Sequence, residues 1–252
     1  MLALDYGGGM TSRATGGTAP RAPRTGASPA EGLRERKKRL MRQQLSDTAT
    51  RMFLERGFDA VRVAEVAEAC GVSEKTVFNY FPTKESLVLD RLEATVAALR
   101  SGLAEPGIPP LAAALRILAA ELRGVTSALA DQDDPAEAVA RYQRFGSLLR
   151  STPSLQAYQS DMTDRFVAVA AVILAQRAGM SPDEPEPQVA ATALLGLWRV
   201  QFLSLRRHLD GTRTPAQVRE AVTADVHRAA RLVDAGLSAF PPFTSPPRPD
   251  RP

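Results

Sequence analysis

Three side chains within one short stretch, Arg62, Lys75 and Asn79, have the chemistry needed to bind a nucleic acid. A lysine can reach guanine O6 and N7 or a phosphate, and an asparagine can pair with adenine N6 and N7. An arginine at the start of a helix can contact phosphate. Such a contact orients a protein on the nucleic acid but does not distinguish one base sequence from another. Lys75 taken alone also fits a solvated surface lysine, so the chemistry depends on the elements that hold these residues.

The sequence around them, residues 62–81, predicts two short helices joined by a tight turn. Gly71 suits the positive-φ position that ends the first helix. Ser73 can cap the second helix, Glu74–Tyr80, by accepting from backbone N–H groups of its first turn. A helix, a glycine turn and a second helix with a polar outer face form the helix-turn-helix, whose second helix enters the DNA major groove. The first helix has an apolar stripe at i, i+3, i+4 and i+7, made of Val63, Val66, Ala67 and Cys70.

The run VAEVAEACGVSEKTVFNYFPTKESL resembles the helix-turn-helix of the tetracycline-repressor (TetR/AcrR) family of bacterial transcription regulators. The resemblance covers about residues 38–98. Arg62 stands where the family usually has Thr, and Phe78 stands where Tyr is usual. Both departures bear on phosphate contacts and not on the fold. The residues that match in order and spacing are the Gly-Val-Ser turn, Thr76, Tyr80, Phe81, Lys84 and Leu87.

The resemblance also implies phosphate contacts from Thr76, Tyr80 and Lys84. Lys84 would stand at the first turn of the next helix, where backbone N–H groups add to anion binding. Two alternatives stay open: the ring of Tyr80 can simply pack, and Cys70 fits a small buried apolar residue better than a redox sensor. The predicted DNA contacts are therefore Arg62, Lys75, Thr76, Asn79, Tyr80 and Lys84.

Composition indicates an ordinary globular chain with one strongly basic end. Of the 252 residues, 44% are apolar and 24% are charged. Neither a bilayer-spanning run of ~18 apolar residues nor a secretory signal is evident. A single cysteine fits a reducing cytoplasm, and one Cys with two His argues against a structural zinc site, so no metal and no cofactor are expected. Residues 1–42 carry a net charge of +6 and the remainder −2, which places the positive charge just ahead of the motif.

The chain is predicted to be all-α, with a three-helix helix-turn-helix head joined by a connecting helix to a helical body. Residues 1–30 and 241–252 have compositions typical of disorder, and Met10 offers a later start. Residues 31–103 form the predicted DNA-binding domain, and residues 104–240 the effector-binding and dimerisation domain. Helices are expected at Leu33–Arg56, Lys84–Gly102, Leu111–Leu129, Pro135–Arg150, 153–178, Gln188–Leu209 and Ala216–Ser238.

One helix-turn-helix head reads only a few base pairs, so useful affinity requires two heads spaced about 34–36 Å apart or a multiple of it. Members of the resembled family pair through their last two long helices. The helix Gln188–Leu209 is apolar nearly all round, which suits a partner on one face, although burial within one subunit explains it as well. The predicted seam consists of Leu195, Val200, Leu203, Val222, Val226 and Leu237.

The body shows no sequence motif for a ligand. The resemblance implies a pocket lined by large residues of its helices, with Arg141 and Gln143 as polar contacts, although for each residue alone ordinary core packing is the better explanation. The predicted pocket residues are Arg141, Tyr142, Phe145, Leu149, Met162, Phe166, Trp198 and Phe202.

These features together predict a cytoplasmic, sequence-specific DNA-binding transcription regulator. We expect a homodimeric repressor that a small-molecule effector releases from a (pseudo)palindromic operator. An effector-independent regulator, an activator of the same fold and a nucleoid or scaffold protein are the alternatives. An enzyme is not expected, because no nucleophile–base pair, phosphate loop or G-x-S-x-G elbow is present.

Overall fold

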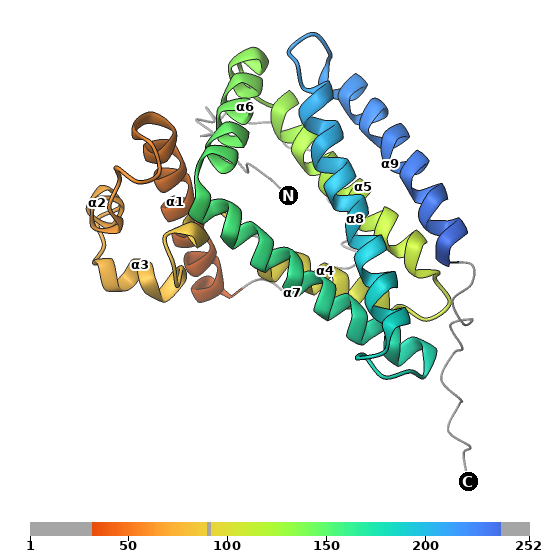
Figure 1. Ribbon diagram of the computed structural model, residues 1–252. Helices are drawn as coiled ribbons and strands as arrows, with labels where there is room; N and C mark the ends of the chain where they lie inside the picture. The colour runs from red at the N-terminus through yellow and green to blue at the C-terminus, as the bar shows by residue number, and fades with distance from the viewer. Residues whose placement is uncertain (1–31, 90–91, 238–252) are drawn as a thin grey trace, which may run out of the picture. The chain divides into compact units, whose positions relative to one another are not determined.

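The computed structural model describes residues 32–89 and 92–237, and within these ranges every regular element is a helix (Figure 1). The predicted terminal segments, 1–30 and 241–252, lie outside the described residues. The all-α prediction is confirmed. The elements are α1 (Leu33–Arg56), α2 (Val63–Ala69), α3 (Glu74–Tyr80), the 3-10 turn η1 (Glu85–Leu87), α4 (Leu92–Ala104), α5 (Pro110–Ala130), α6 (Pro135–Ser151), α7 (Pro153–Ala178), α8 (Pro185–His208) and α9 (Pro215–Leu237).

The head is built from α1, α2 and α3 around a small apolar core. Gly71, at φ +67°, makes the turn between α2 and α3. The hydroxyl of Ser73 accepts from the backbone N–H of Thr76 at 3.1 Å, so the predicted cap of α3 is present. Both motif helices have seven residues, too short to be stable alone, and therefore depend on packing. The core consists of Leu45, Ala49, Phe53, Phe58, Val61, Val66, Val77, Phe81 and Leu87.

The chain after α3 differs from the single predicted helix Lys84–Gly102. Thr83 and Ser86 cap each other, with both N–H to hydroxyl distances at 3.2 Å, and this begins the 3-10 turn η1. The hydroxyl of Ser46 then donates to the carbonyl of Leu87 at 2.8 Å. That carbonyl would otherwise accept within a continuing α-helix. The connecting helix α4 is therefore separate from this 3-10 turn and is described from Leu92 to Ala104.

The body consists of α4 to α9, packed mainly as neighbouring pairs. The helices α8 and α9 run side by side, α7 packs on α8, and α4 packs on both α7 and α5 (Figure 1). Because α4 packs within the body, the two compact units divide between Val88 and Leu89, upstream of the predicted boundary at 103/104. The helix α8 begins at Pro185 and not at Gln188, since a proline fits the first helical turn. Within the described ranges, no helix is long and apolar enough to cross a membrane.

Arg177, in the last turn of α7, joins α7 to the end of α4 and to the loop that follows α4. Its guanidinium donates to the carbonyl of Leu103 at 2.6 Å and to that of Ile108 at 2.8 Å. We expect Arg177→Met to lower the free energy of unfolding by about 2 kcal/mol, because two carbonyls lose a charged donor. Urea unfolding measures this loss, with Arg165→Met, exposed on the same helix, as the control. Equal stabilities of the two variants would contradict this role.

Candidate functional site

The start of α1 and the outer face of α3 together form an open groove of about 870 Å³. The α3 side of the groove contributes Thr76, Asn79 and Tyr80, three of the predicted DNA contacts. Lys75 is exposed on the same short helix. The groove therefore joins hydrogen-bonding groups to a positively charged wall, the combination that binds bases and phosphates together. The α1 side is lined by Leu33, Arg34, Lys37, Lys38 and Met41.

Arg42, on α1, fixes the C-terminal end of α3. Its guanidinium donates to the carbonyl of Tyr80 at 2.9 Å and lies 4.7 Å from the centre of the Phe81 ring. Phe81 itself is fully buried. One arginine thus satisfies a carbonyl at the end of α3 and stacks on the residue that anchors this helix in the core.

We expect Arg42→Met to lower the stability of the head by about 1.5 kcal/mol, because Met keeps the apolar stem but loses the donor. DNA affinity should fall as well, since the end of α3 is no longer held in place. Urea unfolding and a gel shift measure the two effects. Arg51→Met, exposed on the same helix, is the control. A variant that loses neither stability nor affinity would show that packing alone positions α3.

The start of α2 is organised by Glu65, which holds the predicted contact Arg62. The Glu65 carboxylate accepts from the Arg62 backbone N–H at 2.7 Å and pairs with the Arg56 guanidinium at 2.8 Å. The backbone N–H and then Arg56 lower the pKa of Glu65 to about 2. The Arg62 guanidinium stays 3.6 Å from Glu65 and largely exposed, so it is free to turn toward a phosphate.

Two predicted phosphate contacts also have partners inside the head. The ammonium of Lys84 lies 4.4 Å from the centre of the Phe58 ring and 5.7 Å from that of Phe53. The hydroxyl of Thr76 lies 2.8 Å from that of Ser73. Both side chains are partly exposed. They therefore help to hold the head together, and their phosphate contacts stay predictions.

Two family models match the chain in agreement with this geometry. Residues 45–90 match the model described as bacterial regulatory proteins, tetR family. Residues 122–237 match the model of the MftR C-terminal domain. A curated relative, the HTH-type transcriptional regulator TcmR of Streptomyces glaucescens, is 30% identical over 165 residues, which cover 64% of this chain and 71% of TcmR. The chain belongs to the TetR family of bacterial regulatory proteins.

A second curated relative agrees with this membership. The transcriptional regulator MftR of Mycobacterium tuberculosis is 29% identical over 153 residues, which cover 61% of this chain and 73% of MftR. The crystal structure of NalD from Pseudomonas aeruginosa is 19% identical, with a TM-score of 0.46, and is aligned over 76% of this chain and 97% of NalD. TetR-family members are transcription regulators and not enzymes. The prediction of a transcription regulator and the prediction that the protein is not an enzyme are therefore confirmed.

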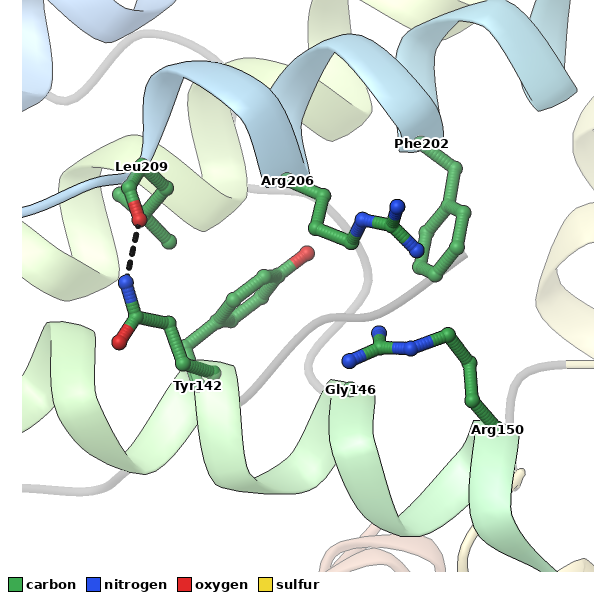
Figure 2. Close-up of a pocket in the computed structure, with 7 residues that line it drawn as sticks. Tyr142, Gly146, Arg150, Phe202, Arg206 and Leu209 are labelled. Carbon is green, nitrogen blue, oxygen red and sulfur yellow. Dashed lines mark hydrogen bonds between the residues drawn. The ribbon is translucent and has the colours of Figure 1, made fainter.

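The body of this TetR-family protein contains a pocket of about 400 Å³ between α6 and α8 (Figure 2). Two of the predicted pocket residues, Tyr142 and Phe202, line it. Gln143 lines it too and donates to the carbonyl of Leu209 at 2.7 Å, which ties α6 to the end of α8. Two arginines also line the pocket and were not among the predicted residues, namely Arg150 and Arg206.

The other predicted pocket residues do not line this pocket. Arg141 donates to the side chain of Gln132 at 3.3 Å. The indole N–H of Trp198 donates to the Glu121 carboxylate at 3.0 Å, which fixes its ring against α5. The remaining four are buried in the helical core, namely Phe145, Leu149, Met162 and Phe166.

The predicted dimer seam contains both buried and exposed residues. Leu195, Val222 and Val226 are buried within the single chain, which does not favour them as contacts to a partner, and their place in the seam stays a prediction. Val222 and Val226 face inward because α9 packs on α8 and α5 of the same chain. Val200 is half-buried and Leu203 is exposed, so both remain candidates. The side chain of Leu237 lies outside the description.

Proposed function

We propose that the protein is a homodimeric repressor that binds a (pseudo)palindromic DNA operator and leaves it when a small-molecule effector binds the body. The observation that carries the proposal is the groove between α1 and α3. It combines the cations Arg34, Lys37 and Lys38 with Asn79 and Tyr80 of the recognition helix. Membership of the TetR family supports regulation of transcription, and the site of action of such a protein is the cytoplasm, where bacterial DNA lies.

Exposed apolar side chains on α8 and α9 support the homodimer. Leu203 on α8 is 42% exposed and Leu232 on α9 is 77% exposed. Isolated exposed leucines are common, but two on the adjacent helices α8 and α9 fit a surface that pairs with its own copy. In that dimer, each copy supplies one recognition helix to one half-site.

A gel shift with the DNA upstream of the protein's own gene tests operator binding. The same duplex with its base order shuffled is the control, and both are titrated over a salt series. We expect the upstream duplex to bind more tightly at every salt concentration, with affinity falling as salt rises. Equal affinity for the two duplexes would sink the proposal of operator recognition.

Effector release requires a ligand that binds the DNA-free state more tightly than the DNA-bound state. Binding of ligand and operator must then weaken each other by the same factor. The ligand can shift the equilibrium toward the DNA-free state only by the ratio of its affinities for the two states. We therefore expect a ligand that raises the thermal unfolding temperature of the body to lower operator affinity. Ligands that stabilise the body without changing operator affinity would contradict release.

A further inference from the structure

The pocket between α6 and α8 is lined on opposite sides by two cations. Arg150 lies in the last turn of α6, and Arg206 lies in the last turn of α8. Their guanidinium groups point toward the same space in Figure 2. The seven lining residues include no Asp or Glu, so the pocket wall offers these two charges no counter-ion. Two facing like charges without a counter-ion repel each other, and an anion between them removes that repulsion.

The hydroxyl of a largely buried tyrosine points into the same space. The side chain of Tyr142 is 5% exposed, and in Figure 2 its hydroxyl points toward the two guanidinium groups. Among the described residues, no protein group is within hydrogen-bonding geometry of this hydroxyl. Burial raises the pKa of Tyr142, which keeps the hydroxyl protonated and therefore able to donate. A protonated hydroxyl beside two guanidinium groups can donate to an acceptor of a ligand that lies between them.

Apart from Gln143, whose amide is bonded to the carbonyl of Leu209, the remaining wall is apolar and leaves room for the guanidinium of Arg150. A Cβ at position 146 would lie 3.2 Å from Nη1 of Arg150, so the absence of a side chain at Gly146 gives the guanidinium its place over α6. Phe202 and Leu209 supply apolar surface beside the charged groups. A volume of about 400 Å³ is within the size range of small-molecule sites.

We propose that this pocket binds the anionic head of an amphipathic organic molecule, a carboxylate or a phosphate, between Arg150 and Arg206. Tyr142 donates to the same head, and Phe202 and Leu209 contact the apolar part. Paired arginines suit both anions, because a guanidinium presents parallel donors to two oxygens. This assignment rests on the proposed function only in that it names the chemical class of the effector; binding itself can be measured without DNA.

Isothermal titration calorimetry of the full chain with three matched probes tests the site. The probes are 2-naphthoate, 2-naphthyl phosphate and 2-naphthalenemethanol, which share one apolar ring system and differ in the head. We expect at least one anion to bind about tenfold or more tightly than the alcohol. A preference between the two anions then tells whether the natural head is a carboxylate or a phosphate. Equal binding of all three probes, or no binding of any of them, would overturn the proposal.

Substitutions locate the binding site. Arg150→Gln and Arg206→Gln should each weaken the anion about tenfold and leave the alcohol unchanged, because each removes one charged donor. Tyr142→Phe should weaken the anion less, since it removes a neutral donor and keeps the ring. Arg199→Gln makes the same charge change at an exposed position of α8 outside the pocket and should bind like the parent. Equal losses in Arg199→Gln and Arg206→Gln would refute the site.

Both arginines also lie where a helix dipole favours a cation, so thermal unfolding of each variant is recorded alongside. A variant that loses anion affinity at unchanged unfolding temperature supports the site, and one that changes only the temperature counts against it. A gel shift with the bound anion separates the two proposals. If the anion binds in the pocket but does not weaken operator binding, the site stands and effector release by it fails.

Discussion

Replacing Asp225 with Asn is expected to lower the free energy of unfolding at pH 7 by about 3 kcal/mol. Asp225 lies on α9 and is 8% exposed. Its Oδ2 accepts from the Ser204 hydroxyl and the Arg207 guanidinium, both at 2.7 Å, and lies 3.1 Å from Nε2 of His208. Its Oδ1 accepts from Arg228 at 2.5 Å. One carboxylate therefore joins α8 to α9.

The isosteric amide cannot replace this carboxylate. Whichever way the Asn side chain is turned, its NH₂ group faces a guanidinium that cannot accept, either Arg207 at the Oδ2 position or Arg228 at the Oδ1 position. Ser204 is 1% exposed, so its hydroxyl has no water to replace the lost acceptor. Arg207 and Arg228 are more than half exposed, and water compensates much of their loss. Most of the effect therefore comes from the buried side of the cluster.

The pKa of Asp225 gives the pH dependence of this stabilisation. The Ser204 hydrogen bond, followed by His208, Arg228 and Arg207, lowers the pKa to about 2 in the folded protein. Because the folded value is below the unfolded one, the stabilisation is fully present above about pH 4 and is lost as the pH falls toward 2. The difference between parent and Asp225→Asn should therefore be large at pH 7 and much smaller at pH 2.5. Urea unfolding at the two pH values measures it.

The matched control is Asp234→Asn, the same substitution at an exposed position of the same helix. It should change stability by less than about 0.5 kcal/mol at pH 7. A cluster that joins α8 to α9 also bears on the proposed homodimer, because these are the helices that would pair. A stability difference that does not depend on pH would show that packing, and not the charge of Asp225, accounts for the loss.

The elements of the head were predictable from local signals. Gly71 and Ser73 mark the turn and the cap of α3, and the structure places both as expected. The start of the predicted helix Lys84–Gly102 was not predictable, because it depends on a contact between residues distant in sequence. The Ser46 hydroxyl takes the carbonyl of Leu87, and nothing near residue 87 signals this.

The same limit applies to the pocket and the seam. Tyr142, Gly146 and Arg150 recur at four-residue spacing on one face of α6, as do Phe202 and Arg206 on α8. That periodicity marks the two faces, but only the packing of α6 near α8 brings them together. Val222 and Leu203 are both apolar residues of long helices, yet one is fully buried and the other exposed. The face of α9 that is buried in the monomer core is set by its packing against α5 and α8. The hydrophobic pattern of α9 alone does not show which of its apolar residues that packing buries.

Replacing Asn79 with Ala is expected to remove most of the discrimination between the operator and random DNA. Asn79 is exposed on α3 and lines the groove with Tyr80 and Thr76. A bidentate contact to a base is worth about 1–3 kcal/mol, and a dimer loses it in both half-sites, so about 2–6 kcal/mol of discrimination disappears. Affinity for shuffled DNA should hardly change, because the phosphate contacts stay in place.

The contrasting variant is Lys37→Gln, on the α1 side of the same groove. A cation that contacts only phosphate should weaken operator and shuffled DNA alike. It should also reduce the slope of log affinity against log salt by about 0.9 for each head. Gel shifts of both variants on both duplexes over a salt series separate base reading from phosphate attraction. If Asn79→Ala behaves like Lys37→Gln, Asn79 contacts the backbone, and sequence reading must come from Lys75 or from the shape of the DNA.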